Sequence, residues 1–312
     1  EIHAILAEFD LPYRYPENVE KIANSIPEKI SESEIASRRD FRNIPTFTID
    51  PIDAKDFDDA LSIEELENGN YEIGVHIADV THYVSQGSVL DKEAFNRATS
   101  VYLVDRVIPM LPEKLSNKIC SLRPNEEKLC FSAVFEMDSS ANIKKQWFGN
   151  TIINSDRRFN YAEAQQIIDN DKGVFCNELK IFDGLSKILR KNRFNNNSIS
   201  FDRTEVKFEL DEKSFPISIS FCENEDTHSL IEEFMLLANK RVAEIISKVD
   251  TGKKPKTFVY RIHDLPDPDK ISNFSKFLKK FGYGLKTNSA NNISSSLNNL
   301  FKQLEGKKEQ NL

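Results

Sequence analysis

The feature that most constrains the fold of this chain is a dense run of acidic residues near position 50. Five aspartates occupy ten consecutive positions, and they are Asp50, Asp53, Asp56, Asp58 and Asp59. Apolar residues such as Ile49, Ile52 and Phe57 are interleaved with them and favour a loop that lies against a hydrophobic core. Carboxylates drawn toward a core are costly unless a positive charge compensates them. The run therefore predicts carboxylates that converge on a cation at the margin of the core.

Hard divalent cations with oxygen ligands fit such a set best, and they support phosphoryl chemistry. A solvated acidic turn is the simpler alternative, but it does not explain the interleaved apolar residues. A calcium-binding EF-hand loop does not fit, because counting from Asp56 places Ala60 and Leu61 where a ligand and a glycine are required. A general acid–base pair would leave the other acids unexplained. The run thus predicts a metal-dependent, phosphate-cleaving enzyme, in which two Mg²⁺ ions roughly 4 Å apart clamp the attacking and leaving oxygens.

The segments that flank the acidic run have the pattern of β-strands. Thr46–Asp50 leads into the run and Ala60–Leu66 leaves it. Asn68-Gly69-Asn70 is a strong hairpin signal, and Tyr71–Ile77 alternates as the returning strand. We therefore expect the carboxylates on a loop at the mouth of a hairpin, where a rigid sheet can orient them.

Helices and strands follow one another along the rest of the chain. The predicted helices are Glu17–Ala23, Glu32–Arg38, Asp91–Arg97, Tyr161–Asp169, Glu178–Phe194, Ser229–Val249 and Ile271–Phe281. The further predicted strands are Leu129–Met137, Ile143–Ile153, Ser198–Phe201, Glu205–Leu210 and Ile217–Cys222. The Asn/Ser-rich stretch Asn288–Asn299 is assigned no regular element. This mixture predicts an α+β fold.

Charge and cysteine content narrow the class of protein. The formal net charge of −8 argues against a general polyanion binder, which would carry clustered Lys and Arg. The four cysteines have neither a zinc spacing nor a disulfide framework, so a reducing cytoplasm is expected. No apolar run approaches the ~20 residues that cross a bilayer.

Six segments in order along the chain carry a resemblance to a known family. They are Thr48–Ala60, His76–Tyr83, Ile108–Pro112, Cys120–Glu126, Leu230–Asn239 and Tyr260–Pro268. On these segments the chain resembles the RNase II/RNase R family of hydrolytic, processive 3′→5′ exoribonucleases. The resemblance implies their catalytic RNB domain, an α+β fold with a mixed β-sheet and flanking helices.

The resemblance also implies the residues of a catalytic and metal site. The family's four essential aspartates match Asp50, Asp56, Asp58 and Asp59. Asp50, Asp56 and Asp59 would bind Mg²⁺, for which Mn²⁺ could substitute. Asp58 would hold a second ion or orient the attacking water. Asp53 lies outside this set and is interpreted as a residue that caps the loop.

Three further residues match RNA-binding positions of the family. Tyr102 would pack on the 3′-terminal nucleotide, Phe201 would stack on the terminal bases, and Glu232 would contact the terminal ribose. Without the resemblance, Tyr102 and Phe201 would be core aromatics, and Glu232 would lie on the solvated face of a helix. Aromatic stacking tolerates any base, and contacts to hydroxyls distinguish RNA from DNA.

The implied organisation places the tail of a cold-shock (OB-type) module and a linker in residues 1–35. Residues 36–312 would form an incomplete RNB domain, truncated at its C-terminal part, and an S1 domain is expected in the parent chain. A Ser-Pro-Ile-Arg-Arg-Tyr run, whose arginine stabilises charge on the scissile phosphate in the family, is not found here. The fragment could therefore be inactive although the parent protein is not.

The implied reaction is hydrolysis of single-stranded RNA from its 3′ end, with water attacking the terminal phosphodiester to release 5′-nucleoside monophosphates. One alternative is a catalytically silent RNA-binding relative or scaffold. A second is a metal-dependent DNase or phosphatase on another fold, which would not require Tyr102, Phe201 and Glu232 at these positions. Structural polar roles are expected for residues that could suggest another metal site, namely His76, Asp79, His82, His263 and Asp264.

Overall fold

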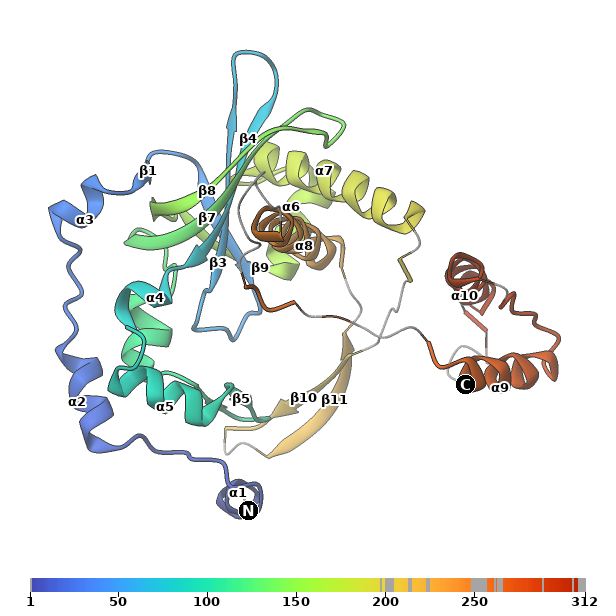
Figure 1. Ribbon diagram of the computed structural model, residues 1–312, viewed down its shortest axis with the longest axis horizontal. Helices are drawn as coiled ribbons and strands as arrows, with labels where there is room; N and C mark the ends of the chain where they lie inside the picture. The colour runs from blue at the N-terminus through green and yellow to red at the C-terminus, as the bar shows by residue number, and fades with distance from the viewer. Residues whose placement is uncertain are drawn as a thin grey trace.

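The structure is a computed structural model that describes residues 2–196, 198–199, 205–212, 215–222, 225–247, 257–260, 262, 266–287, 289–304 and 306–307. Its centre is a seven-stranded sheet (Figure 1). The spatial order is β1 (Arg39–Phe41), β8 (Ile143–Asn154), β7 (Glu127–Met137), β4 (Tyr71–Ala78), β3 (Asp59–Glu65), β2 (Thr46–Asp50) and β9 (Arg157–Asn160). The inner pairs are antiparallel, whereas the outermost pairs β1–β8 and β2–β9 are parallel. The predicted mixed sheet and α+β class are confirmed.

The hairpin that follows the acidic run forms as predicted. β3 and β4 pair from Asp59↔Ile77 to Glu65↔Tyr71. The turn between them is closed by the hydrogen bond from Leu66 N to Asn70 O at 2.8 Å. Gly69 has a φ of +76°, which glycine adopts without the steric cost of a side chain. This hairpin fixes the start of β3, which lies one residue earlier than predicted, at Asp59.

Each face of the sheet is covered by its own hydrophobic cluster, because strand residues alternate between the faces. One face packs against α6 (Tyr161–Asn170), α7 (Cys176–Asn195) and α8 (Asp226–Ser247) (Figure 1). In this cluster the Phe47 ring of β2 meets Phe182 of α7 at 5.6 Å between centroids, edge to face. Phe182 in turn meets Phe234 of α8 at 5.0 Å. These aromatic contacts anchor the helices to the strand that carries Asp50.

The other face packs against elements from the first half of the chain. They are α2 (Glu17–Ser25), α4 (Val80–Tyr83), α5 (Val89–Arg97) and a π-helix (Lys114–Ile119). Leu90 of α5 and Leu115 of the π-helix are buried there beside Ala60 of β3. The segment after the π-helix is thereby held close to the acidic run.

The remaining elements are short or lie at the periphery. They are α1 (Ile2–Glu8), α3 (Glu32–Ala36), β5 (Val101–Tyr102), β6 (Val107–Ile108), β10 (Glu205–Leu210), β11 (Pro216–Cys222), α9 (Pro268–Lys279) and α10 (Ala290–Leu304). β5 pairs with β6 and β10 with β11, each as a separate two-stranded sheet. Helices α9 and α10 pack on each other away from the central sheet (Figure 1).

Several elements differ from the sequence-based expectation. The Asn/Ser-rich stretch is helical in α10, where Leu297, Leu300 and Leu304 form a buried stripe that the polar composition obscured. The helix predicted to reach Arg38 ends at Ala36. β1 and β9 were not predicted, since strands of three and four residues carry little periodic pattern. Of the predicted strand Ser198–Phe201, residues 198–199 are not in a strand and the rest lies outside the described residues, as do the last two residues of the predicted helix Ser229–Val249.

Among the described helices, none has the length and apolarity that a span across a bilayer requires.

Candidate active site

The acidic residues lie at one edge of the central sheet, by which we mean the side where β2 ends and β3 begins and not an outermost strand. Asp50 is the last residue of β2 and Asp59 is the first residue of β3. Because β2 and β3 are antiparallel neighbours, the end of one strand and the start of the other meet at the same edge. Residues 51–58, which we call the acidic loop, connect the two strands. The predicted position at the mouth of a hairpin is therefore observed for the run as a whole.

Main-chain hydrogen bonds fix the second half of the acidic loop. The amide of Phe57 donates to Ser121 Oγ at 3.0 Å, and the Ser121 hydroxyl donates to the carbonyl of Lys55 at 3.2 Å. The amide of Leu122 donates to the carbonyl of Phe57 at 2.8 Å. Ser121 and Leu122 are fully buried, so the loop is attached to a rigid part of the molecule. This attachment determines where the residues on either side of Phe57 lie.

Asp50 is a buried carboxylate with an unsatisfied oxygen. The residue is 7% exposed, and Oδ2 makes no hydrogen bond within the described part of the chain. Burial raises the pKa of Asp50 to about 7, and the negative charges of Asp59 and Asp58 add to the rise, while the Thr48 hydroxyl and the Arg158 guanidinium oppose it. A bound cation at this position would offset the energetic cost of the buried negative charge and the repulsion between the carboxylates.

Asp59 and Asp58 are affected by the same causes. Burial, followed by the charge of Asp58, raises the pKa of Asp59 to about 6. Loss of hydration and the charge of Asp56 raise the pKa of Asp58. Asp58 is nevertheless an exposed residue, so we rest the electrostatic argument on Asp50 and Asp59. Such raised carboxylate pKa values concentrate at functional sites.

The donor chemistry of this set suits a hard divalent cation, because it consists of carboxylate oxygens and one of them is buried without a partner. The carboxylates are close enough to interact by charge. However, no three His, Cys, Asp or Glu side chains of the described residues are grouped so that they could hold a metal ion. The metal-ligand role of Asp50, Asp56, Asp58 and Asp59 therefore stays a prediction.

Asp53 lies on the same loop but differs from the other four acids. It is exposed, and its side chain makes no hydrogen bond to any residue that the structure describes. The predicted capping of the loop by Asp53 is therefore not seen.

Tyr102 lies beside the acidic loop. It is 68% exposed on β5, which excludes the alternative of a core tyrosine. Partial burial raises the pKa of its hydroxyl, and the charges of Asp56 and Asp58 and a hydrogen bond with Asp56 raise it further. The ring is thus exposed next to the acidic residues, where it could stack on a base. Phe201, the second predicted stacking residue, lies outside the described residues.

Glu232 lies on α8 and is exposed. Its carboxylate accepts from Arg193 Nη2 at 3.2 Å. The neighbouring Glu233 is 3% exposed and accepts from Arg193 Nε at 3.0 Å. Glu232 is thus on the solvated face of α8, whereas Glu233 is buried in an ion pair with Arg193. Whether Glu232 contacts ribose is a prediction.

Sequence reasoning missed two residues of the site, Tyr161 and Arg158. Tyr161 is the first residue of α6, and burial, with the charges of Asp59 and Asp50, raises its pKa to about 12. Its ring stacks on His228 of α8 at 3.8 Å between centroids. Arg158 lies on β9, the strand next to β2. The signal that could have found both residues is the parallel pairing of β9 with β2, which the sequence does not show locally.

His76 and Asp79, in the segment His76–Tyr83, have structural roles, as expected. His76 is fully buried, with Nδ1 2.7 Å from Ser132 Oγ and Nε2 2.8 Å from Ser62 Oγ. Burial lowers its pKa to about 3, so the ring is neutral. Asp79 caps α4 by accepting from the His82 amide at 3.2 Å. His263 and Asp264 lie outside the described residues.

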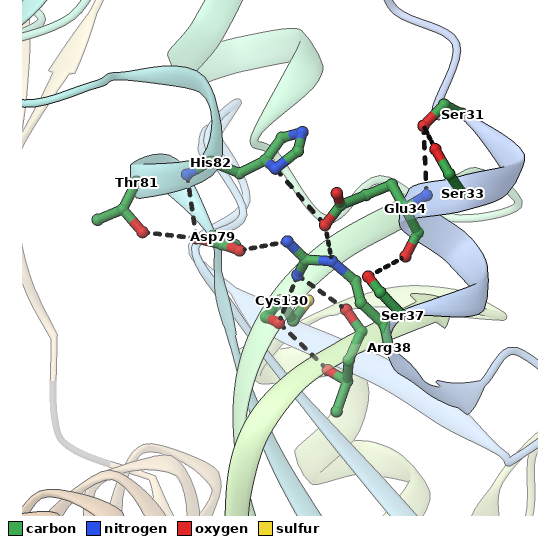
Figure 2. A network of polar contacts seen from close by, with 10 residues as sticks. Ser31, Ser33, Glu34, Ser37, Arg38, Asp79, Thr81, His82 and Cys130 are labelled. Carbon is green, nitrogen blue, oxygen red and sulfur yellow. Dashed lines mark hydrogen bonds and ion pairs between the residues drawn. The ribbon is translucent and has the colours of Figure 1, made fainter.

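Arg38 connects Asp79 to the edge of the sheet, as Figure 2 shows. Its Nη2 donates to Asp79 Oδ2 at 2.7 Å and its Nε donates to Glu34 at 2.6 Å. Its Nη1 donates to the carbonyls of Cys130 at 3.1 Å and Thr151 at 3.4 Å. In the Arg38 network, the buried charges of Arg38 and Asp79 are paired with each other, and Glu34 at the margin adds a second carboxylate.

Comparison with known proteins gives a consistent result. The family model for the RNB domain matches residues 38–312. Ribonuclease R 1 of Lactococcus lactis is 40% identical over 312 residues, covering 98% of this chain and 38% of that protein. Ribonuclease R of Aquifex aeolicus is 39% identical and covers 100% of this chain and 44% of that protein. DIS3-like exonuclease 2 of Schizosaccharomyces pombe is 42% identical, covering 89% of this chain and 32% of that protein. The chain thus spans less than half the length of these relatives.

Solved structures agree on the fold. RNase R of Mycoplasma genitalium in complex with double-stranded RNA has a TM-score of 0.88 at 27% identity, covering 99% of this chain and 55% of that one. The same enzyme with ribose-methylated single-stranded RNA has a TM-score of 0.86, with coverages of 99% and 48%. Yeast Ssd1, described as a pseudonuclease, has a TM-score of 0.68 at 21% identity over 86% of this chain and 33% of that one. The likeness to Ssd1 is one of fold alone.

Proposed function

Since the chain belongs to the RNB-domain family, we propose that its parent protein is a hydrolytic 3′→5′ exoribonuclease that degrades single-stranded RNA to 5′-nucleoside monophosphates. One observation carries the proposal. Four aspartates lie at one edge of the sheet, and the two in the strands, Asp50 and Asp59, are held with pKa values of about 7 and about 6. The ribonuclease names of the relatives support it.

The proposed cofactor is Mg²⁺, with Mn²⁺ as a substitute. Asp50, Asp56, Asp58 and Asp59 would hold it, because they supply oxygen ligands and the charge that a hard dication requires. When bound, the ion supplies Lewis-acid activation of the scissile phosphodiester. Asp58 is the most exposed of the four and is therefore the one placed to orient the attacking water and accept its proton.

Contacts to the RNA would come from residues around this edge. The exposed Tyr102 ring would stack on the 3′-terminal nucleotide, with Phe201 stacking on the terminal bases. Glu232 would accept a hydrogen bond from a ribose hydroxyl and so favour RNA over DNA. The fixed position of Arg193 beside Glu232 supports this role, since it holds the carboxylate in place.

Other parts of the parent protein are included in the proposal. Cold-shock and S1 domains would supply the basic surface that a chain of net charge −8 lacks. An arginine from a later segment would stabilise charge on the scissile phosphate. The cytoplasm is the proposed location.

A catalytically silent RNA-binding relative is the rival function, and the fold shared with Ssd1 keeps it relevant. Against it stands the state of Asp50. A protein without a cation site has no physical reason to keep an unsatisfied carboxylate oxygen buried at the edge of its sheet.

The test is degradation of 5′-labelled poly(A) by the full-length parent protein. We expect degradation of the RNA only when Mg²⁺ or Mn²⁺ is present. The DNA oligonucleotide of matching sequence should not be degraded. Asp58→Asn should bind RNA without cutting it, whereas Asp53→Asn, a change on the same loop, should behave as the wild type. Full activity of Asp58→Asn would refute the mechanism, and rapid cleavage of the DNA would favour a metal-dependent DNase. Assaying residues 1–312 beside the full-length protein shows whether this part suffices.

A further inference from the structure

Arg158 is a charged residue beside the acidic loop, and the proposed reaction assigns it no role. In the parallel pairing of β9 with β2, Arg158 lies opposite Thr48, and Asn160 lies opposite Asp50. Nevertheless, Nη2 of Arg158 donates a hydrogen bond to the carbonyl of Pro51, the residue after Asp50. The Arg158 side chain therefore extends along β2 from the level of Thr48, past Asp50, to the first residue of the acidic loop.

The same guanidinium also contacts the other end of the acidic loop. Its Cζ lies 5.5 Å from the centre of the Phe57 ring, within the range of a cation–π contact. Phe57 lies between Asp56 and Asp58 in the chain. Arg158 thus contacts both ends of the acidic loop, while Ser121 and Leu122 hold the Phe57 main chain by hydrogen bonds.

The chemistry of arginine suits this bridging position. A guanidinium is a rigid plane with several N–H donors, so it can donate to a carbonyl at its edge while an aromatic ring lies against it. Its charge also lies within Coulombic reach of Asp50. In addition, Nε of Arg158 is buried and makes no hydrogen bond within the described part of the chain. A lysine could supply the charge and N–H donors, but not the rigid plane that lies against an aromatic ring.

We propose that Arg158 is a positioning residue of the acidic site, which holds the two ends of the acidic loop so that its carboxylates keep their places beside Asp50. The catalytic consequence rests on the proposed function, but the ordering of the loop does not. Arg157 provides a matched control. It is the preceding residue on β9, and its side chain pairs instead with Glu163 of α6.

Hydrogen exchange of the metal-free full-length protein tests the positioning directly. Compared with the wild type, Arg158→Gln should accelerate exchange of the Lys55–Asp59 amides about tenfold, as expected for the loss of one charge-assisted hydrogen bond. Arg158→Lys should show a smaller acceleration, and Arg157→Gln none. Unchanged loop exchange in Arg158→Gln would overturn the proposal. Equal acceleration throughout β7 and β8 would also overturn it, because Arg158 would then be a general stability residue.

A second measurement is Mn²⁺ binding without RNA. Residues that orient ligands typically alter metal affinity by about 10–100-fold, so Arg158→Gln should weaken binding by at least about tenfold, and Arg157→Gln should not. With RNA as substrate, kcat of Arg158→Gln should fall while its KM changes little. Arg158→Lys should retain part of the kcat that Arg158→Gln loses. Tighter Mn²⁺ binding by Arg158→Gln would contradict the proposal, since it would mean that Arg158 acts only by repelling the ion. If the wild type bound no Mn²⁺ while loop exchange still rose only in Arg158→Gln, the positioning role would stand and the metal-dependent function would be wrong.

Discussion

Asp50 and Asp79 are the same type of residue with the same exposed fraction, 7%, yet their pKa values are shifted in opposite directions. Asp79 accepts hydrogen bonds from Arg38, Thr81 and the His82 amide. Burial alone would raise its pKa, but the bonds from Arg38 and Thr81 outweigh burial and lower the pKa below its usual range. Asp50 has an unsatisfied Oδ2, and its pKa is raised to about 7. Burial raises the pKa of both carboxylates, and the partners of each one decide whether that rise persists.

The comparison separates a structural charge from a functional one. The Arg38 network joins α3, α4, β7 and β8, so its charges help to hold elements together (Figure 2). The acidic edge holds carboxylates near one another with few compensating groups, an arrangement that lowers stability unless a ligand binds. Such a cost is expected at a site retained for binding.

The largest expected effect is on activity. In the full-length protein, Asp50→Asn should reduce RNA degradation about 10³-fold, since the proposed cation loses a buried ligand. The free energy of unfolding should stay the same or rise, because an amide has no charge to bury. Gel assays of labelled poly(A) and urea denaturation measure the two quantities. A strongly destabilised Asp50→Asn protein would show that Asp50, like Asp79, is a structural charge.

The next effect is on stability and concerns the Arg38 network. Arg38→Met should lower the free energy of unfolding by about 3 kcal/mol, because Asp79 would be left buried without its cation. The double variant Arg38→Met/Asp79→Asn should recover most of this loss, since asparagine is neutral and can still cap α4. Urea denaturation at neutral pH checks both values. Additive losses in the double variant would mean that the two residues act independently.

The two aspartates should also give opposite dependences of stability on pH. The folded protein keeps a proton on Asp50 up to about pH 7, whereas the unfolded chain releases it near about pH 3.9. The folded state therefore binds more protons in this interval, and stability contributed by Asp50 falls as pH rises from about 4 to about 7, by on the order of 4 kcal/mol. Asp79 has a lowered pKa, so its contribution is present above its usual pKa and is lost only as pH falls below it.

Denaturation of the metal-free protein at about pH 5 and about pH 7.5 tests this sign. The difference in unfolding free energy between Asp50→Asn and the wild type should grow with pH in favour of the variant. A difference that is constant, or that shrinks, would contradict the raised pKa of Asp50.

The smallest effect concerns Tyr102, which partners Asp56 at the exposed side of the acidic edge. Tyr102→Phe should change stability by less than about 0.5 kcal/mol, because an exposed hydrogen bond exchanges with water. Tyr102→Ala should weaken RNA binding by about 1 kcal/mol through the loss of stacking. Fluorescence anisotropy with a labelled oligonucleotide distinguishes the two variants. Equal losses of affinity would show that the hydroxyl, not the ring, contacts the RNA.

The parts of the site that sequence could predict are local in the chain. The acidic run, β2 and the turn at Gly69 lie within a short segment, and turn chemistry and alternation alone place the loop at the edge of a sheet. The burial of Asp50 also followed from its apolar neighbours. What remained open was the arrangement of the carboxylates, because side-chain orientation depends on residues far away in the chain.

The parts that sequence missed depend on tertiary contacts. Arg158 reaches the acidic loop only because β9 pairs in parallel with β2, about a hundred residues away. Glu233 is buried and paired with Arg193 of α7, a contact that no pattern within α8 indicates. The helix α10 was obscured by its polar composition, since its leucine stripe packs on Leu278 of α9. Propensity describes the segment, whereas these outcomes depend on its partner.

The most direct test of the account is a titration of the metal-free full-length protein with Mn²⁺, followed by electron paramagnetic resonance at about pH 7.5. The wild type and Asp53→Asn should bind Mn²⁺ alike, and Asp50→Asn should bind it at least about tenfold more weakly. If Asp50→Asn bound Mn²⁺ as tightly as Asp53→Asn does, the unsatisfied carboxylate at the end of β2 would not be a metal ligand, and the proposed hydrolysis would lose its basis.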